Sequence, residues 1–139
     1  MPDYLFIYGT LLPGRAPSRL APVMATLPPL GPGSMRGRLY DLGRYPGAIS
    51  DSTTAGRIRG EVLGLPDARA VLKMLDAYEG YNPAMPSESL FVRARRPVSL
   101  ADGGKIRCWV YLYGQDPGKA PVVPHGDYRR LKRAKESSD

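Results

Sequence analysis

Three apolar runs in the first half of the chain have the length and composition of β-strands. YLFIY (4–8) is apolar and aromatic throughout and ends at Gly9, which is typical of a strand buried on both faces. RGRLYDL (36–42) and RIRGEVLGL (57–65) are looser and carry internal glycines, which predict bulges or a close approach of two backbones. We therefore expect the first half of the chain to be mostly sheet.

A β-hairpin is predicted in the second half. The strand-like runs SLFVRARRPVSL (89–100) and KIRCWVYLY (105–113) flank ADGG, and Asp-Gly-Gly is a strong turn signal. In the second run, alternation places Ile106, Cys108, Val110 and Leu112 on one face and Arg107, Trp109, Tyr111 and Tyr113 on the other. Core packing is the expected role of most of the aromatic face, and lining a pocket is the alternative.

One helix interrupts the strands, at about residues 66–79. Pro66 suits the first helical position, Asp67 complements the positive end of the helix dipole, and Gly80 is a natural stop. At about 3.6 residues per turn, the inward stripe is Val71, Leu72, Leu75 and Tyr78, with Arg69, Lys73 and Asp76 opposite.

Glu79 breaks two rules for this helix. It follows Leu72 by one heptad and so points into the apolar stripe, and it lies in the last turn, where the helix dipole disfavours a carboxylate. A local violation in an otherwise consistent segment is typical of a functional residue. The structural alternative is a glutamate at the helix end that turns into solvent or meets an arginine.

Length and composition indicate one globular domain with many turns. The chain has 139 residues, of which 42% are hydrophobic and 24% charged, and its 16 glycines and 15 prolines show no repeat. Cys108 is the single cysteine, so we expect a buried thiol, no disulfide framework and a reducing compartment. The N-terminal apolar run is too short for a signal peptide or a membrane span, which favours a cytoplasmic location without a membrane partner.

The net charge of +7 lies partly at the C-terminus. Residues 1–127 contain 15 Lys and Arg against 11 Asp and Glu, which gives +4, and residues 128–139 contain 5 against 2, which gives +3. We expect residues 129–139 to form a basic, flexible tail. No nucleic-acid partner is expected, because no nucleic-acid motif or aromatic-interleaved basic stripe accompanies the tail; a basic nucleic-acid-associated protein is the less favoured alternative.

Several common chemistries are excluded by the residues present. A single histidine, His125, and a single cysteine make neither a zinc set nor a Cys–His pair. The chain has no GxSxG turn, and no GxGxxG follows a strand. Any chemistry must therefore use carboxylates, hydroxyls and backbone amides, and no metal is expected.

Two motifs together resemble the gamma-glutamylcyclotransferase-like family. They are YGTL (8–11) after the N-terminal strand and LDAYEG (75–80) at the helix end, and their separation makes the pair fairly specific. Further matches over most of the chain are YPGAI (45–49), GEV (60–62), LFVR (90–93) and GDY (126–128). The chain departs from the family at Phe91, where a tyrosine is usual, and in the longer insert YNPAMPSES (81–89), both on one side of the expected pocket.

The resemblance implies a cofactor-independent γ-glutamyl cyclotransferase acting on a small γ-glutamyl substrate. Such an enzyme releases 5-oxoproline and a free amine or amino acid when the substrate's α-amine attacks its own γ-carbonyl. Glu79 falls on the family's general acid/base, and a carboxyl of raised pKa suits both proton transfers. A noncatalytic module that binds a small anion is the alternative function. Which γ-glutamyl compound is used, and the oligomeric state, do not follow from the sequence.

The same resemblance implies a substrate-binding loop. Backbone amides at Gly9, Thr10 and Leu11 are expected to hold the substrate carboxylate, and Gly9 permits a close approach because it has no Cβ. The side chains considered as pocket walls or donors, with ordinary packing as the alternative for each, are Tyr8, Tyr113 and Tyr128. The implied fold is α+β, a small mixed β-barrel-like sheet with few helices that occupies residues 1–128.

Overall fold

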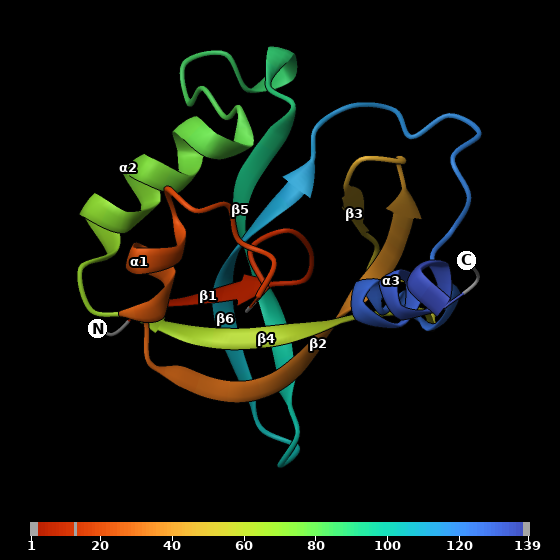
Figure 1. Ribbon diagram of the computed structural model, residues 1–139, viewed down its shortest axis with the longest axis horizontal. Helices are drawn as coiled ribbons and strands as arrows, with labels where there is room; N and C mark the ends of the chain where they lie inside the picture. The colour runs from red at the N-terminus through yellow and green to blue at the C-terminus, as the bar shows by residue number, and fades with distance from the viewer. Residues whose placement is uncertain (1–2, 13, 138–139) are drawn as a thin grey trace.

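The computed structural model describes residues 3–12 and 14–137, and its centre is a six-stranded mixed sheet (Figure 1). The strands are β1 (Asp3–Ile7), β2 (Pro29–Asp41), β3 (Pro46–Ser50), β4 (Arg57–Leu65), β5 (Phe91–Leu100) and β6 (Lys105–Tyr113). Their order is β3-β2-β4-β1-β6-β5, and β2 also pairs with β5, which closes five strands into a barrel and leaves β3 at its margin. The predicted α+β class with a small mixed barrel is confirmed.

Three α-helices accompany the barrel in the described part of the chain. Helices α1 (Ala21–Ala25) and α2 (Ala68–Glu79) lie on one side of it, and α3 (Tyr128–Ser137) lies on the other (Figure 1). Two short 3-10 turns, Pro86–Glu88 and Pro124–Gly126, occur in the connections. No helix within the described residues has the length and apolar character needed to cross a membrane.

Strand predictions succeed where a run is rich in apolar residues and fail where prolines and glycines dominate it. The observed β4 and β6 have the predicted bounds, and the ADGG turn joins β5 to β6. Strand β2 begins at Pro29 and not at the predicted residue 36. The prediction missed its first residues, PLGPG, because they look like a loop in sequence. A register shift between Pro29 and Gly31 accommodates them against β4. Strand β3 and helix α1 were not predicted.

Helix α2 ends as predicted and begins slightly later. Gly80 adopts φ 69° and ψ 35°, a left-handed conformation that glycine accepts without strain, and it terminates the helix. The helix begins at Ala68 after Asp67, so the expectation that Pro66 occupies the first helical position was wrong. Its apolar residues Val71, Leu72 and Leu75 are buried as expected.

The hydrophobic core fills the barrel. Its most deeply buried members come from all of the closed strands and include Leu5, Phe6, Met35, Ile58, Val62, Val98 and Val110. Cys108 is a free, fully buried thiol, and burial raises its pKa to about 12. The thiol is therefore a small apolar group of the core, as predicted.

The C-terminal segment is helical up to Ser137. Tyr128 is buried against the core, and the Arg129 guanidinium lies 2.9 Å from a carboxylate oxygen of Glu61 on β4. Helix α3 begins at Tyr128, next to the predicted boundary between the domain and the tail, and that boundary stays a prediction. Flexibility of residues 129–139 stays a prediction, and residues 138–139 lie outside the described part.

Candidate active site

The loop after β1 is placed at one end of the barrel by the position of its strand. Strand β1 lies between β4 and β6, and the chain turns immediately after it, where the Leu12 N–H donates to the Gly9 carbonyl at 3.0 Å. A Cβ on Gly9 would lie 2.7 Å from Cγ of Pro46, so only glycine allows the loop to approach β3 this closely. Within the described residues, no group accepts a hydrogen bond from the N–H of Thr10 or Leu11.

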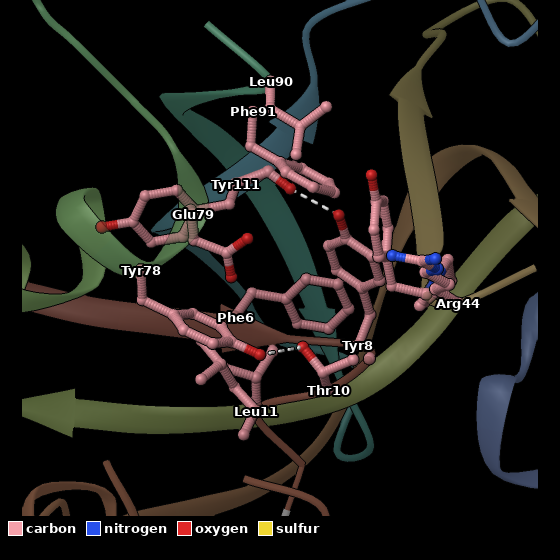
Figure 2. A pocket seen from close by; sticks show the side chains of 14 residues that line it. Phe6, Tyr8, Thr10, Leu11, Arg44, Tyr78, Glu79, Leu90, Phe91 and Tyr111 are labelled. Atoms are coloured by element: carbon pink, nitrogen blue, oxygen red, sulfur yellow. Dashed lines mark hydrogen bonds between the residues drawn. The ribbon is translucent and has the colours of Figure 1, made fainter. Parts of the chain in front are cut away.

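This loop forms one wall of a pocket of about 310 Å³ (Figure 2). The other walls come from the start of β3, the end of α2 and the start of β5. The lining residues fall in 6–11, 44–46, 78–79 and 90–91, together with Tyr111 of β6. Segments far apart in sequence therefore meet at this end of the barrel, and the pocket is lined mainly by aromatic and apolar side chains, as small-molecule sites are.

Glu79 is the acidic residue of this lining. Figure 2 shows its carboxylate directed into the pocket, on the side of Phe6 and Tyr8. No hydrogen bond or ion pair joins it to another residue in the described part of the chain. Burial raises the pKa of Glu79 to about 8, because the charged form loses hydration that nothing replaces. At neutral pH the side chain is therefore mostly a neutral acid.

Asp76, one turn earlier on α2, has opposite surroundings. Its two carboxylate oxygens accept hydrogen bonds from Nε and Nη2 of Arg93 at 2.9 and 3.1 Å, and one of them also accepts from the Tyr111 hydroxyl at 2.7 Å. The prediction that Asp76 lies on the solvent-facing side of the helix was wrong, because α2 packs beside β5 and β6 and this side meets their side chains. The three hydrogen bonds hold the end of α2 next to the pocket.

Tyr8 connects the loop to β6. Its hydroxyl donates a hydrogen bond of 2.5 Å to the Tyr111 carbonyl (Figure 2). Burial, and after it the negative charge of Glu79, raise the pKa of Tyr8 well above its ordinary value. The phenol therefore stays protonated, and its proton is already engaged in the protein, so Tyr8 forms a pocket wall in this structure.

The other two tyrosines singled out from the sequence do not line this pocket. Tyr113 packs its ring edge-on against Phe91, with centroids 5.6 Å apart. Tyr128 is buried at the start of α3, with the guanidinium of Arg15 5.8 Å from its ring centroid. Phe91, which departs from the usual tyrosine, is itself part of the lining.

Sequence reasoning missed three polar lining residues: Arg44, Tyr45 and Tyr78. Tyr78 was assigned to the apolar stripe of α2, but its hydroxyl lies 3.0 Å from the Thr10 hydroxyl and links α2 to the loop. Arg44 lies across the pocket from Glu79 (Figure 2) and forms no ion pair with any described residue. The one feature of the sequence that could have pointed to Arg44 is its position directly before the YPGAI motif.

The barrel and its pocket define a class: a small α+β barrel protein with a pocket at one end whose lining includes a carboxyl group. The sequence model described as "Gamma-glutamyl cyclotransferase, AIG2-like" matches residues 5–130, and the chain belongs to that family. The match confirms the resemblance inferred from YGTL and LDAYEG. No curated protein sequence matches the chain.

Several solved structures share the fold. YkqA from Bacillus subtilis gives a TM-score of 0.73 at 19% identity, and the match covers 99% of this chain and 43% of YkqA, so this chain spans less than half the length of that relative. An AIG2-like protein from Mus musculus gives 0.68 at 21% identity, with 91% of this chain and 93% of that chain covered. A protein described as a gamma-glutamyl cyclotransferase gives 0.61 at 18% identity, with 99% and 81% covered.

Proposed function

We propose that the protein is a cofactor-independent γ-glutamyl cyclotransferase in which Glu79 is the general acid and base. The observation that carries the proposal is a pocket-facing carboxyl without a protein partner, whose pKa is raised to about 8 by burial. Such a group can take a proton and return it near neutral pH. Membership in the family supports the reaction class.

The proposed reaction begins with one proton transfer. The substrate's α-ammonium, once beside Glu79, stabilises the carboxylate and then gives up a proton to it, which leaves a neutral acid and a free amine. The apolar walls favour this neutral pair over two charges. The amine nitrogen then attacks the γ-carbonyl carbon and forms the ring C–N bond. Glu79 gives this proton to the leaving nitrogen as the original amide C–N bond breaks, and the carboxylate so formed takes the second proton from the ring nitrogen, which yields 5-oxoproline and a free amine. Transfer of that proton to the released amine regenerates the Glu79 carboxylate.

The loop after β1 is proposed to hold the substrate's α-carboxylate. The N–H groups of Thr10 and Leu11 donate to no described residue, and successive N–H groups in a tight turn form a small anion site. Gly9 brings the loop close to β3, and the Thr10–Tyr78 contact fixes the loop relative to the end of α2. The α-amine of the same substrate would then lie toward Glu79.

Arg44 favours one kind of leaving group. Its guanidinium, which pairs with no acidic group among the described residues, lies at the far side of the pocket from Glu79 (Figure 2), where it attracts an anionic group and repels a cationic one. We therefore expect a γ-glutamyl dipeptide, whose released amino acid carries a carboxylate, to be a better substrate than a γ-glutamyl polyamine.

The direct test is product analysis. Purified protein is incubated separately with γ-glutamyl dipeptides, γ-glutamyl-lysine isopeptide and γ-glutamyl polyamines, and 5-oxoproline and the released amine are measured by mass spectrometry. The proposal expects equal amounts of both products from at least one substrate, with the dipeptides preferred. Release of glutamate in place of 5-oxoproline would show that the protein hydrolyses the substrate. Release of neither product from any of the substrates would favour the alternative of a noncatalytic binding module.

A further inference from the structure

A second pocket of about 380 Å³ lies apart from the first and shares no lining residue with it. It is formed by β2, β3, β4 and the β5–β6 hairpin, and its lining contains no acidic residue. Four basic side chains line it: Arg36, Arg57, Arg96 and Lys105. Three serines, Ser50, Ser52 and Ser99, add hydroxyl groups.

Arg57 donates more hydrogen bonds to described residues than the other three cations do. Its guanidinium is partly buried, and Nε and Nη2 donate to the Ser34 hydroxyl at 3.1 and 2.9 Å, while Nη2 also donates to the Ser99 hydroxyl at 2.9 Å. These serines hold the guanidinium in place and leave its charge uncompensated. Nη1 of Arg57 makes no hydrogen bond to any described residue and remains available to a ligand.

Arg96 is held in a similar way. Its Nε donates to the Ser50 hydroxyl at 3.1 Å and its Nη1 donates to the Arg95 carbonyl at 2.7 Å, which leaves Nη2 without a partner in the described part of the protein. A positioned guanidinium with free N–H groups matches the planar, two-point geometry with which arginine binds phosphate.

The strand register places two of these positive charges opposite each other, which is electrostatically unfavourable. Arg36 on β2 is directly opposite Arg57 on β4, so the two like charges project from the same face of the sheet. Like charges in this position destabilise a sheet. None of the four basic residues forms an ion pair with a residue that the structure describes; the acidic groups that do form pairs contact Arg38, Arg93, Arg95 and Arg129.

We propose that this pocket is a binding site for a small phosphate-bearing molecule, a phosphate monoester or a diphosphate. A doubly charged phosphate would relieve the repulsion between Arg36 and Arg57, whereas a single carboxylate would offset only part of four positive charges. The pocket is concave and has the size of a small-molecule site, which favours a compact ligand over an extended nucleic-acid strand. The site is independent of Glu79 and of the proposed cyclisation.

Sodium pyrophosphate is the probe, titrated calorimetrically into the full-length protein at constant ionic strength. The variants Arg57→Gln and Arg96→Gln test the two positioned guanidinium groups. Arg36→Gln with Lys105→Gln is a second test that changes only exposed side chains and so spares the fold. Arg69→Gln is the matched control, because Arg69 is exposed on α2 and lines neither pocket.

The expected result is saturable binding at one site, weakened at least about tenfold by each pocket variant and less than about twofold by Arg69→Gln. Equal weakening by Arg69→Gln would show a diffuse charge effect and would overturn the site. Absence of saturable binding would overturn it as well. Tighter binding of a single-stranded oligonucleotide that is lost in the same variants would assign this face to nucleic acid instead.

Discussion

Two carboxyl groups on one helix have opposite surroundings in this protein. Asp76 accepts three hydrogen bonds from Arg93 and Tyr111, whereas Glu79 accepts none from the described residues. The first positions the helix through these hydrogen bonds, and the second has a pKa raised to about 8 by its apolar surroundings. At the scale of single residues, this difference separates the proposed acid/base from its structural neighbour.

Glu79→Gln is expected to stabilise the fold at pH 7. The folded pKa of about 8 lies above the ordinary pKa of 4.5, so the folded state binds more protons than the unfolded state between these values, and stability falls as pH rises through this window. Glutamine removes that loss. Its advantage at pH 7, about 2.5 pH units above the ordinary pKa at ~1.4 kcal/mol per unit, is expected to be on the order of 3 kcal/mol and to be nearly lost near pH 4, where Glu79 is mostly protonated in both states.

Thermal or urea unfolding at pH 4 and pH 7 measures this difference. Glu88→Gln is the matched control, since Glu88 is exposed in the 3-10 turn and lines no described pocket. A Glu79→Gln variant that loses stability at pH 7 would show that Glu79 is a structural ion-pair partner with a depressed pKa.

Gly9→Ala is expected to weaken substrate binding. The new methyl group would meet Pro46 at 2.7 Å, so the loop must shift and its N–H groups move relative to Glu79. We expect KM for a γ-glutamyl substrate to rise at least about fivefold. Gly64→Ala is the control, because its Cβ also meets a proline ring, Pro28, at 3.0 Å, but away from the pocket. An equal rise of KM in the two variants would show that the loop is only a turn and does not hold the substrate.

At the scale of elements, the position of Glu79 depends on how the end of α2 is fixed. Asp76 and Arg93 form a bidentate pair, and the Arg93 guanidinium also lies 4.7 Å from the centroid of a Trp109 ring. Asp76→Asn and Arg93→Met are each expected to cost about 1–3 kcal/mol of stability and to lower kcat. The double variant should lose less stability than the sum of the losses in the two single variants, because the partners act as a unit. Additive costs would show that the pair does not couple α2 to β5.

The elements that could be predicted are those in which side chains carry the signal. Strand β6 alternates, and α2 has a clear stripe and a glycine stop, so the bounds of β6 and the end of α2 follow from the sequence. The start of β2 could not be predicted, because its prolines and glycines resemble a loop and become strand only through pairing with β4. The position of Asp76 was missed for a related reason: a helical wheel does not show that β5 and β6 supply its partners.

Two glycines of the family-like motifs have a structural reason that no sequence pattern shows. A Cβ on Gly60, in GEV, would lie 2.0 Å from the Ile7 carbonyl oxygen, where β4 passes β1 just before the loop. A Cβ on Gly126, in GDY, would lie 1.8 Å from the Arg57 carbonyl oxygen, and this glycine has φ +64°. These motifs therefore include residues that let backbones approach closely.

At the scale of the whole molecule, barrel closure creates the site. The loop after β1, the end of α2 and the starts of β3 and β5 are remote in sequence, and the strand order places them at one end of the barrel. Glu79 and the loop could be nominated from motifs, but Arg44 could not, because its place opposite Glu79 depends on β3, which was not predicted. The basic pocket was equally hidden, since only the register brings Arg36 beside Arg57.

Deletion of residues 129–139 tests whether α3 belongs to the folded unit. The deletion removes the Arg129–Glu61 ion pair and the packing of Leu131 against the core. We expect a loss of about 1–2 kcal/mol and a melting point lower by several degrees, in a single transition. Arg129→Gln alone should cost less. An unchanged melting point after the deletion would support a separate flexible tail.

The central claim is that Glu79 performs the proton transfers of a cyclisation that yields 5-oxoproline. The most direct measurement is the rate of 5-oxoproline release from a γ-glutamyl dipeptide by the wild-type protein, Glu79→Gln and Glu88→Gln under identical conditions. If Glu79 is the acid/base, kcat falls at least about 100-fold in Glu79→Gln, while KM changes little and Glu88→Gln matches the wild type. A folded Glu79→Gln protein that keeps more than about a tenth of the wild-type rate would contradict that role.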